Sequence, residues 1–188
     1  MSGSTTALIA TATVVLVVVV WAYNRLIRAK VRVRQGWAQV AVQLQRRHDL
    51  VPRLVEVVRG YAAHEAGVLD DVVARRTAAL SEHDASRRPA AEEAFGDALR
   101  RLIVITESYP DLRADERFAH LSDELRDTED RLAFARDFAS HRVATYRKLT
   151  ETFPGNLLAR AFGFPREQLF ALDDPRAAAV PGIDLRGQ

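Results

Sequence analysis

The hydrophobic pattern opens with an uninterrupted apolar stretch. Residues 7–23 read ALIATATVVLVVVVWAY, and residues 1–24 hold no ionisable side chain. From Ser4 to the end of this segment, a helix would be about 31 Å long, which matches the hydrocarbon core of a bilayer. Trp21 and Tyr23 stand at its end, where aromatic rings favour the headgroup level. The pattern predicts a transmembrane anchor over residues 1–24.

A cleaved signal peptide is the competing interpretation, with Val20-Trp21-Ala22 as a weak cleavage site. Signal peptides carry positive charge before the apolar run, and this segment carries none. Five basic side chains instead follow on its C-terminal side: Arg25, Arg28, Lys30, Arg32 and Arg34. They predict that this side is cytoplasmic and the N-terminus extracytoplasmic, and that they bind anionic headgroups of the cell membrane.

Beyond the anchor the apolar positions recur at three- and four-residue steps, which is typical of amphipathic helices. We expect the first helix to continue to about Arg47. Asp49 then reads as an N-cap with Pro52 in the first turn of a second helix, which runs from Leu50 to about Leu80. This assignment predicts that the chain reverses direction at His48-Asp49.

Two further long helices complete the pattern. The third begins at Pro89 or Ala90 and ends before Pro110. The fourth carries an apolar stripe over five heptads: Phe118, Leu121, Leu125, Thr128, Leu132, Ala135, Ala139, Arg142, Tyr146, Leu149 and Phe153. Arg142 is the exception in this stripe, and we expect it to lean out while Val143 packs in its place. The predicted fold is all-α: an N-terminal transmembrane helix, then an antiparallel four-helix bundle with a short fifth helix.

The short fifth element is an unusually apolar segment at residues 157–170. Its candidate contact residues are Leu157, Leu158, Phe162 and Phe164. If the helices run out, back, out and back, this segment returns to the membrane. Two interpretations stay open: it caps the end of the bundle, or it touches the bilayer surface. The predicted bundle domain spans residues 25–172, and residues 173–188 read as a loose tail.

Charge divides the chain into three zones that the net charge of +2 conceals. Residues 1–24 are uncharged, residues 25–48 carry seven basic and no acidic side chains, and residues 49–188 carry 20 basic and 25 acidic ones. Because the first basic residues stand beside a membrane span and few aromatic residues lie among them, we expect no nucleic-acid partner.

Candidate chemistry is sparse. The chain has no cysteine, which excludes disulfides and thiolate metal sites. Its five histidines form no two-ligand helical motif, and no phosphate-binding glycine loop or serine elbow occurs. Glu92 and Glu93 read as a solvated pair, and His48 as a solvated histidine. We therefore expect no enzyme, no catalytic residue, and no metal or cofactor site.

Longer motifs resemble the LemA family. They are WAQVAVQLQRRHDLVPRLVEVVRGYAAHE from Trp37 to Glu65, ESYPDLRADERFAHLSDELRDTEDRLAFARDF, YRKLTETFPGNLLARAFGF and the Ile183-Asp184-Leu185 tail. The resemblance implies a bacterial single-pass membrane protein with a helical-bundle soluble part and no established active site to carry over. The family pattern leads us to expect a helix-favouring residue at position 36, and Gly36 departs from it.

Two functions follow from these observations. The first is a non-enzymatic, membrane-tethered helical scaffold or interaction module whose protein partner is unidentified and could be another membrane protein. The alternative is a membrane-surface structural protein that senses or shapes lipid through residues 157–170. The sequence leaves the oligomeric state open.

Overall fold

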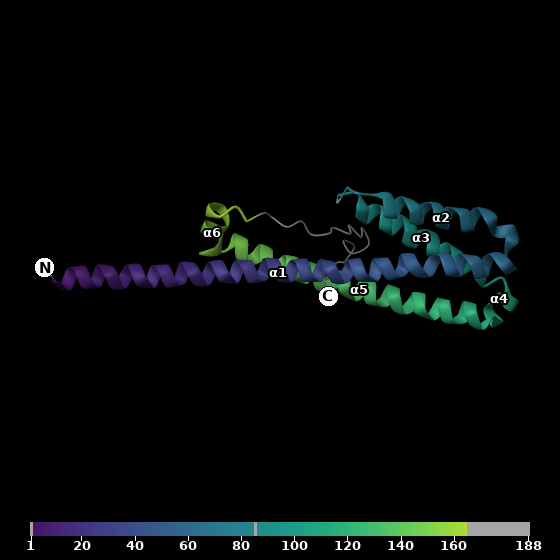
Figure 1. The fold of residues 1–188 in the computed structure, drawn as a ribbon, viewed down its shortest axis with the longest axis horizontal. Helices are drawn as coiled ribbons and strands as arrows, with labels where there is room; N and C mark the ends of the chain where they lie inside the picture. The colour runs from purple at the N-terminus through teal and green to yellow at the C-terminus, as the bar shows by residue number, and fades with distance from the viewer. Residues whose placement is uncertain (1, 85, 165–188) are drawn as a thin grey trace, which may run out of the picture.

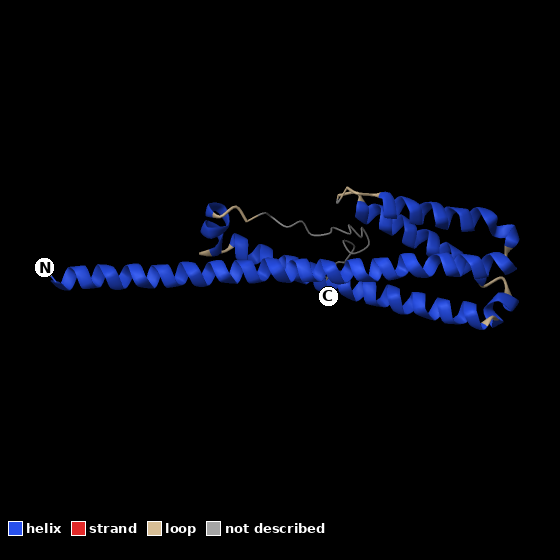
Figure 2. Cartoon of the chain, viewed as in Figure 1, coloured by secondary structure: helices blue, strands red, loops and turns tan. Residues whose placement is uncertain are grey.

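The computed structural model describes residues 2–84 and 86–164, and all of the regular structure in that part of the chain is helical (Figure 2). The elements are α1 (Ser2–Tyr61), a 3₁₀ turn (Ala63–Glu65), α2 (Ala66–Ser81), α3 (Arg88–Thr106), α4 (Pro110–Ala114), α5 (Glu116–Glu151) and α6 (Gly155–Ala161). The predicted all-α class and the apolar N-terminal helix are confirmed. The predicted tail at residues 173–188 lies outside the described residues.

Two antiparallel helix pairs make up the molecule beyond the apolar stretch. α5 runs antiparallel to α1 and packs along it over most of the length of α5. α2 and α3 form a hairpin beside the end of that pair that lies away from the N-terminus (Figure 1). We call residues 47–131 the distal segment, and residues 22–46 together with 132–164 the proximal segment. The buried clusters of the proximal segment take their helical members from α1, α5 and α6, so four long helices do not run side by side over the whole length of the described residues.

The predicted reversal at His48-Asp49 is wrong, because α1 continues without a break to Tyr61. Pro52 lies inside this helix and cannot donate a hydrogen bond to the carbonyl oxygen of His48. Nε of Arg76 in α2 donates to that oxygen at 2.8 Å and replaces the lost bond. The chain reverses at residues 62–65 instead, so the second helix is α2 and begins sixteen residues later than Leu50.

The distal core explains why α2 and α3 stay beside α1 and α5. One buried cluster takes Val51, Leu54, Val55 and Val58 from α1, with further members from α2 to α5: Leu69, Val72, Ala79, Phe95, Ala98, Leu99, Leu102, Leu112, Phe118 and Leu125. Asp115 caps the start of α5 by accepting hydrogen bonds from the backbone N–H groups of Arg117 and Phe118.

The proximal contact is narrow and uses small residues. A Cβ atom on Gly36 of α1 would lie 3.0 Å from Cα of Ala139 in α5, so glycine allows the close approach of the two backbones. This contact accounts for glycine where a helix-favouring residue was expected. Val143 is fully buried and Arg142 is only partly exposed beside it, which confirms the predicted exchange of roles at this point of the stripe.

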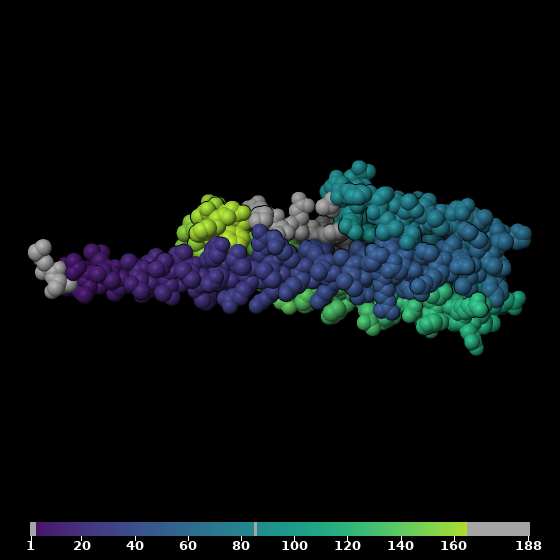
Figure 3. Space-filling view, in the orientation of Figure 1, coloured from purple at the N-terminus to yellow at the C-terminus, as the bar shows by residue number. Residues whose placement is uncertain are grey.

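The N-terminal part of α1 projects alone beyond α6 (Figure 3). Of the described helices, α1 is long and apolar enough to cross a membrane, with a mean hydropathy of 2.3 and 6% of the apolar window buried. Leu8, Val15 and Leu16 in this part are 55–70% exposed, so transfer of their apolar surface from water into a bilayer would be favourable. The helix passes through the expected boundary between residues 24 and 25 without interruption.

Candidate functional site

The predicted membrane-proximal basic residues lie on one continuous helix. Leu26, Ala29 and Val33 of α1 are buried against α5 and α6. The basic side chains occupy the remaining faces: Arg25, Arg28, Arg32 and Arg34 are exposed, and Lys30 is half-buried. The packed stripe and the charged surface thus lie on different faces of α1 in this stretch.

α5 and α6 add positive charge that the chain order conceals. The proximal segment holds 11 basic and 2 acidic side chains, whereas the distal segment holds 13 basic and 19 acidic ones. Arg142, Arg147 and Lys148 come from α5, and Arg160 comes from α6. The antiparallel return of α5 therefore makes the end next to the apolar stretch strongly basic and the far end acidic.

A groove of about 300 Å³ runs between α1 and α5 in this basic region. Its charged lining is Arg25, Arg28 and Arg32 from α1 and Arg142 from α5. Trp21 closes the end next to the apolar stretch, with the guanidinium of Arg25 5.3 Å from the Trp21 ring centre. Basic side chains from two helices thus converge at one surface hollow.

α6 lies beside the end of the apolar stretch. Leu158 is buried against Ala22 and Leu26 of α1, and Phe164 packs edge-on against Tyr23 with ring centres 5.8 Å apart. Leu157 and Phe162 are 58% and 59% exposed, although the Phe162 ring also packs edge-on against Tyr23 with ring centres 5.1 Å apart. The structure thus splits the four candidate contact residues: Leu158 and Phe164 cap the proximal segment, and Leu157 and Phe162 are mostly exposed. Residues 165–170 lie outside the described part of the chain.

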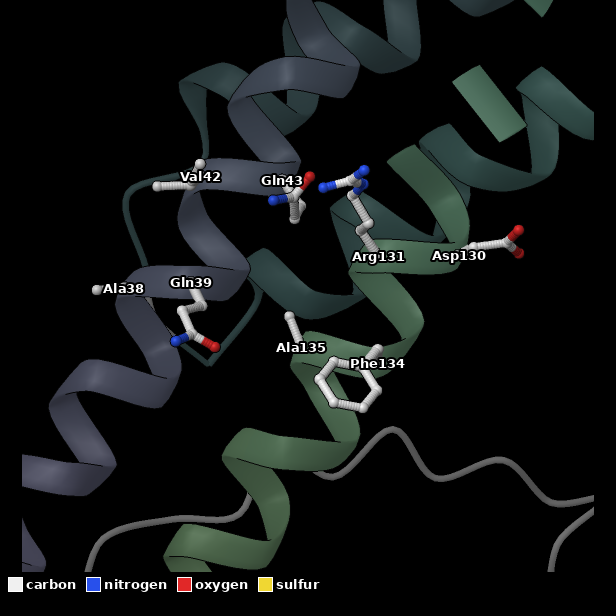
Figure 4. A pocket seen from close by; sticks show the side chains of 8 residues that line it. All are labelled: Ala38, Gln39, Val42, Gln43, Asp130, Arg131, Phe134 and Ala135. Atoms are coloured by element: carbon white, nitrogen blue, oxygen red, sulfur yellow. The ribbon is translucent and has the colours of Figure 1, made fainter. Parts of the chain in front are cut away.

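A gap between α1 and α5 in mid-molecule forms a larger, mostly apolar hollow of about 560 Å³ (Figure 4). Phe134 of α5 projects toward α1 there and is 71% exposed. Ala38, Gln39 and Val42 of α1 line the opposite side. A large exposed aromatic ring on an otherwise charged helix is a candidate protein contact.

A buried ion cluster joins α1 to α3, and sequence reasoning missed it. Arg47, His48 and Glu92 are 1%, 3% and 2% exposed. Arg47 pairs with the Glu92 carboxylate and also donates to the Glu92 carbonyl oxygen at 3.1 Å. Nε2 of His48 lies 3.0 Å from Oε1 of Glu92, and the His48 ring stacks on Phe95 with centres 4.9 Å apart.

The predictions that His48 and Glu92 are exposed to solvent are therefore wrong. Arg47 is buried as well, so it does not belong to the exposed basic surface. A signal was present in the spacing. His48 stands at four- and three-residue steps between Leu44 and Val51, and Glu92 stands three residues before Phe95, so both continue buried apolar stripes. Charged residues at such positions are buried only when a partner helix brings the opposite charge.

The cluster sets the ionisation of its carboxyl group. Burial raises the pKa of Glu92, but the hydrogen bond from His48 and the charges of Arg47 and His48 outweigh it, so the pKa is lowered overall. Burial lowers the pKa of the nearby Arg136 guanidinium, as does the charge of Arg47. Glu92 therefore stays ionised, and its opposite charges link α1 to α3. We call the cluster of Arg47, His48 and Glu92 the buried joint.

Within residues 2–84 and 86–164 no group of three or more histidine, aspartate or glutamate side chains is placed to hold a metal ion. The sites that the structure assembles are thus a basic groove, an apolar hollow, the exposed side of α6 with Leu157 and Phe162, and a buried joint. Each of them is suited to contact with another molecule or to holding helices together.

The family model described as "LemA family" matches residues 36–185. Magnetosome protein MamQ of Magnetospirillum gryphiswaldense is 36% identical over 80 residues, which cover 43% of this chain and 29% of that protein. Magnetosome proteins MamQ 1 and MamQ 2 of Paramagnetospirillum magneticum are each 24% identical over 174 residues, covering 79% of this chain and 64% of the relative. The chain thus spans less than two thirds of the length of these relatives.

Proposed function

The chain belongs to the LemA family, and from that premise we propose that it is a non-enzymatic, membrane-tethered helical interaction module. The observation that carries the proposal is the continuity of α1 from the apolar stretch to Tyr61. Residues after Asn24 extend this helix by about 55 Å, so it would hold the acidic distal segment well clear of a membrane surface. α5 packs along this part of α1, and a packed helix pair bends less than a single helix.

The surface offers a partner two apolar contact points away from the membrane. Phe134 lies in the hollow between α1 and α5, and Val104 of α3 lies in a second groove with Leu99 and Ile103. Both side chains are exposed on helices whose other outward positions are mostly charged or polar. Exposed apolar side chains rimmed by charge are typical of protein-binding surfaces.

Site-specific photo-crosslinking in native membranes tests this function. A photoreactive residue at Phe134 or Val104 should give a discrete adduct, whereas the same residue at Arg113 of α4, an exposed charged position outside both hollows, should not. The absence of a position-dependent adduct from both apolar positions would contradict the interaction role.

We propose the orientation with the N-terminus outside and the helical domain in the cytoplasm, supported by the basic residues that follow the apolar stretch. The chain has no cysteine, so single cysteines give a clean measurement. In intact cells a membrane-impermeant maleimide should label Ser4→Cys and spare Arg126→Cys. The reverse pattern would overturn the orientation.

A second candidate function is contact of α6 with the lipid surface, favoured by the position of α6 beside Ala22 and Leu26. Because the span would end near residue 24, the exposed side chains of Phe153, Leu157 and Phe162 would then stand at headgroup depth. Aromatic and leucine side chains at that depth are typical of interfacial helices.

Depth-dependent quenching distinguishes this candidate. In vesicles, a fluorophore on Phe162→Cys should be quenched by lipids with a spin label near the headgroup. The same fluorophore on Phe134→Cys, an exposed phenylalanine position in the middle of the molecule, should not be quenched. Equal behaviour of the two labels would exclude a lipid role for α6.

A further inference from the structure

The groove beside Trp21 combines charges that have no acidic partner in the described part of the chain. Arg25, Arg28, Arg32 and Arg142 form no ion pair with any acidic side chain of residues 2–84 and 86–164, although Nε of Arg28 donates to the Asn24 carbonyl oxygen at 3.2 Å. From residue 25 to 48, and from residue 138 to 150, the sequence contains no acidic residue at all. Four guanidinium groups that line one hollow of about 300 Å³ repel one another unless an anion lies among them.

The position of the groove selects the kind of anion. Trp21 lies near the end of the stretch that we place in the membrane, one helical turn before Arg25. The headgroup layer is about 5–8 Å thick on each side of the hydrocarbon core, so Arg25 and Arg28 would lie within it. The Cα atom of Arg32 would lie about 12 Å beyond residue 24, outside this layer, and the long side chains of Arg32 and Arg142 can extend back towards it.

We propose that this groove is a binding site for the phosphate of an anionic phospholipid, formed jointly by α1 and α5. Guanidinium groups match phosphate oxygens in bidentate geometry, and several of them suit a headgroup that carries full negative charge. Trp21, Ala29 and Leu149 supply the apolar part of the lining, against which the glycerol end of the lipid can pack. The proposal rests on the membrane anchoring proposed above and goes beyond it, because it names the ligand and makes α5 part of the site.

The site also assigns a role to the one charged residue in the apolar stripe of α5. Arg142 leans over Phe138, with its guanidinium 4.5 Å from the ring centre, and Val143 fills the core position next to it. From there Arg142 faces the α1 arginines across the groove. A lipid held in this way would bind α5 to α1 at the membrane surface.

Fluorescence of Trp21 provides the test. In the Trp37→Phe background Trp21 is the single tryptophan of the full-length chain. In phosphatidylcholine vesicles, a small fraction of brominated phosphatidylglycerol should quench Trp21 more than the same fraction of brominated phosphatidylcholine. Arg142→Gln should weaken the apparent affinity for brominated phosphatidylglycerol about fivefold, the effect of one basic contact at a membrane surface.

The matched control is Arg34→Gln, which removes the same charge from an exposed position of α1 outside the groove. It should weaken the affinity less than twofold, whereas Arg28→Gln, a second groove variant, should behave like Arg142→Gln. Equal effects of Arg34→Gln and the groove variants would show diffuse charge attraction and overturn the site.

Two further arms separate the remaining outcomes. Millimolar glycerol phosphate or inorganic phosphate should leave the preference for the anionic lipid intact, and its loss would assign the groove to a soluble phosphate instead. Quenching of Trp21 by neither brominated lipid would overturn the proposed anchoring and the site together. Quenching by both without preference would overturn the site alone.

Discussion

The distal and proximal segments are built from the same two long helices but are stabilised in different ways. In the distal segment, α1 and α5 share a core cluster with α2, α3 and α4, and an ion cluster is sealed between α1 and α3. In the proximal segment, α1 and α5 pack through small clusters that contain Ala29, Gly36 and Ala139, and α6 covers the end.

The charge distribution follows the same division. The distal segment is acidic and the proximal segment is strongly basic, so an anionic membrane surface attracts one end and repels the other. The thin proximal segment can therefore gain support from lipid, whereas the distal segment carries its own core. The difference predicts that the distal segment sets the stability of the fold and that, with the anchoring proposed above, the proximal segment sets its place at the membrane.

The largest effect is expected for Arg47→Ala in the buried joint. This change leaves the Glu92 carboxylate buried without its main partner, which costs about 3–5 kcal/mol of unfolding free energy. Denaturant unfolding of the full chain in detergent, followed by circular dichroism, measures it. Glu129→Gln removes only the half-exposed partner of Arg47 and should cost much less. Similar losses for the two variants would contradict the importance of the buried pair.

Two leucine truncations compare the cores directly. Leu102 in the distal cluster and Leu132 in the α1–α5 contact are both fully buried. Leu102→Ala should cost about 3–5 kcal/mol and Leu132→Ala about 2–3 kcal/mol, because a two-helix contact collapses more easily around a lost side chain. The same unfolding experiment measures both, and a larger loss for Leu132→Ala would reverse the proposed division of stability.

The lowered pKa of Glu92 predicts how stability depends on acid. A carboxyl group whose folded-state pKa lies below its unfolded value stabilises the fold above the unfolded pKa, and this contribution is lost as the pH falls through the folded value. The free energy of unfolding should therefore decrease below about pH 4.5, by less than Arg47→Ala costs, because protonated Glu92 still forms hydrogen bonds. In Glu92→Gln the acid-dependent part should shrink, and an unchanged pH profile would contradict the assignment.

The smallest effects are expected at two glycines of α1. Gly36→Ala places a Cβ atom 3.2 Å from that of Ala139 and should cost about 1 kcal/mol through tight packing. Gly60→Ala meets no atom within 4 Å and should stabilise the distal end of the helix by up to about 1 kcal/mol. Thermal unfolding of the two variants should shift in opposite directions. Shifts of the same sign would show that the close contact at Gly36 is unimportant.

Several elements were predictable because their signals are local. Short-range pattern and helix geometry predict the apolar stretch and the ends of α3 near Pro89 and Pro110. They also predict that Val143, and not Arg142, is buried in the stripe of α5. The end of α1 was not predictable in this way. Pro52 is a helix-breaking signal in sequence, and Arg76, 24 residues later, removes its cost by a hydrogen bond that exists only after α2 has folded back.

The candidate sites show the same limit. The α1 arginines beside the span and the apolar character of residues 157–164 were visible from the sequence. The contribution of Arg142 to a groove with α1 was not, because it depends on where α5 lies when it returns. The ion cluster was missed because a charged side chain in an apolar stripe can be exposed or paired, and only the helix opposite decides which.

The sequence alone determined that this protein is helical, that its N-terminal stretch is long and apolar enough to span a membrane, and most of the buried stripe of α5. These properties depend on hydrophobic period and side-chain type, which act over a few residues. The tertiary structure decided that α1 runs unbroken to Tyr61, that Arg47, His48 and Glu92 form a buried joint, and that the charges of α1 and α5 converge beside Trp21. Each of these depends on a contact between residues far apart in the chain, whose energy exists only once the helices are side by side.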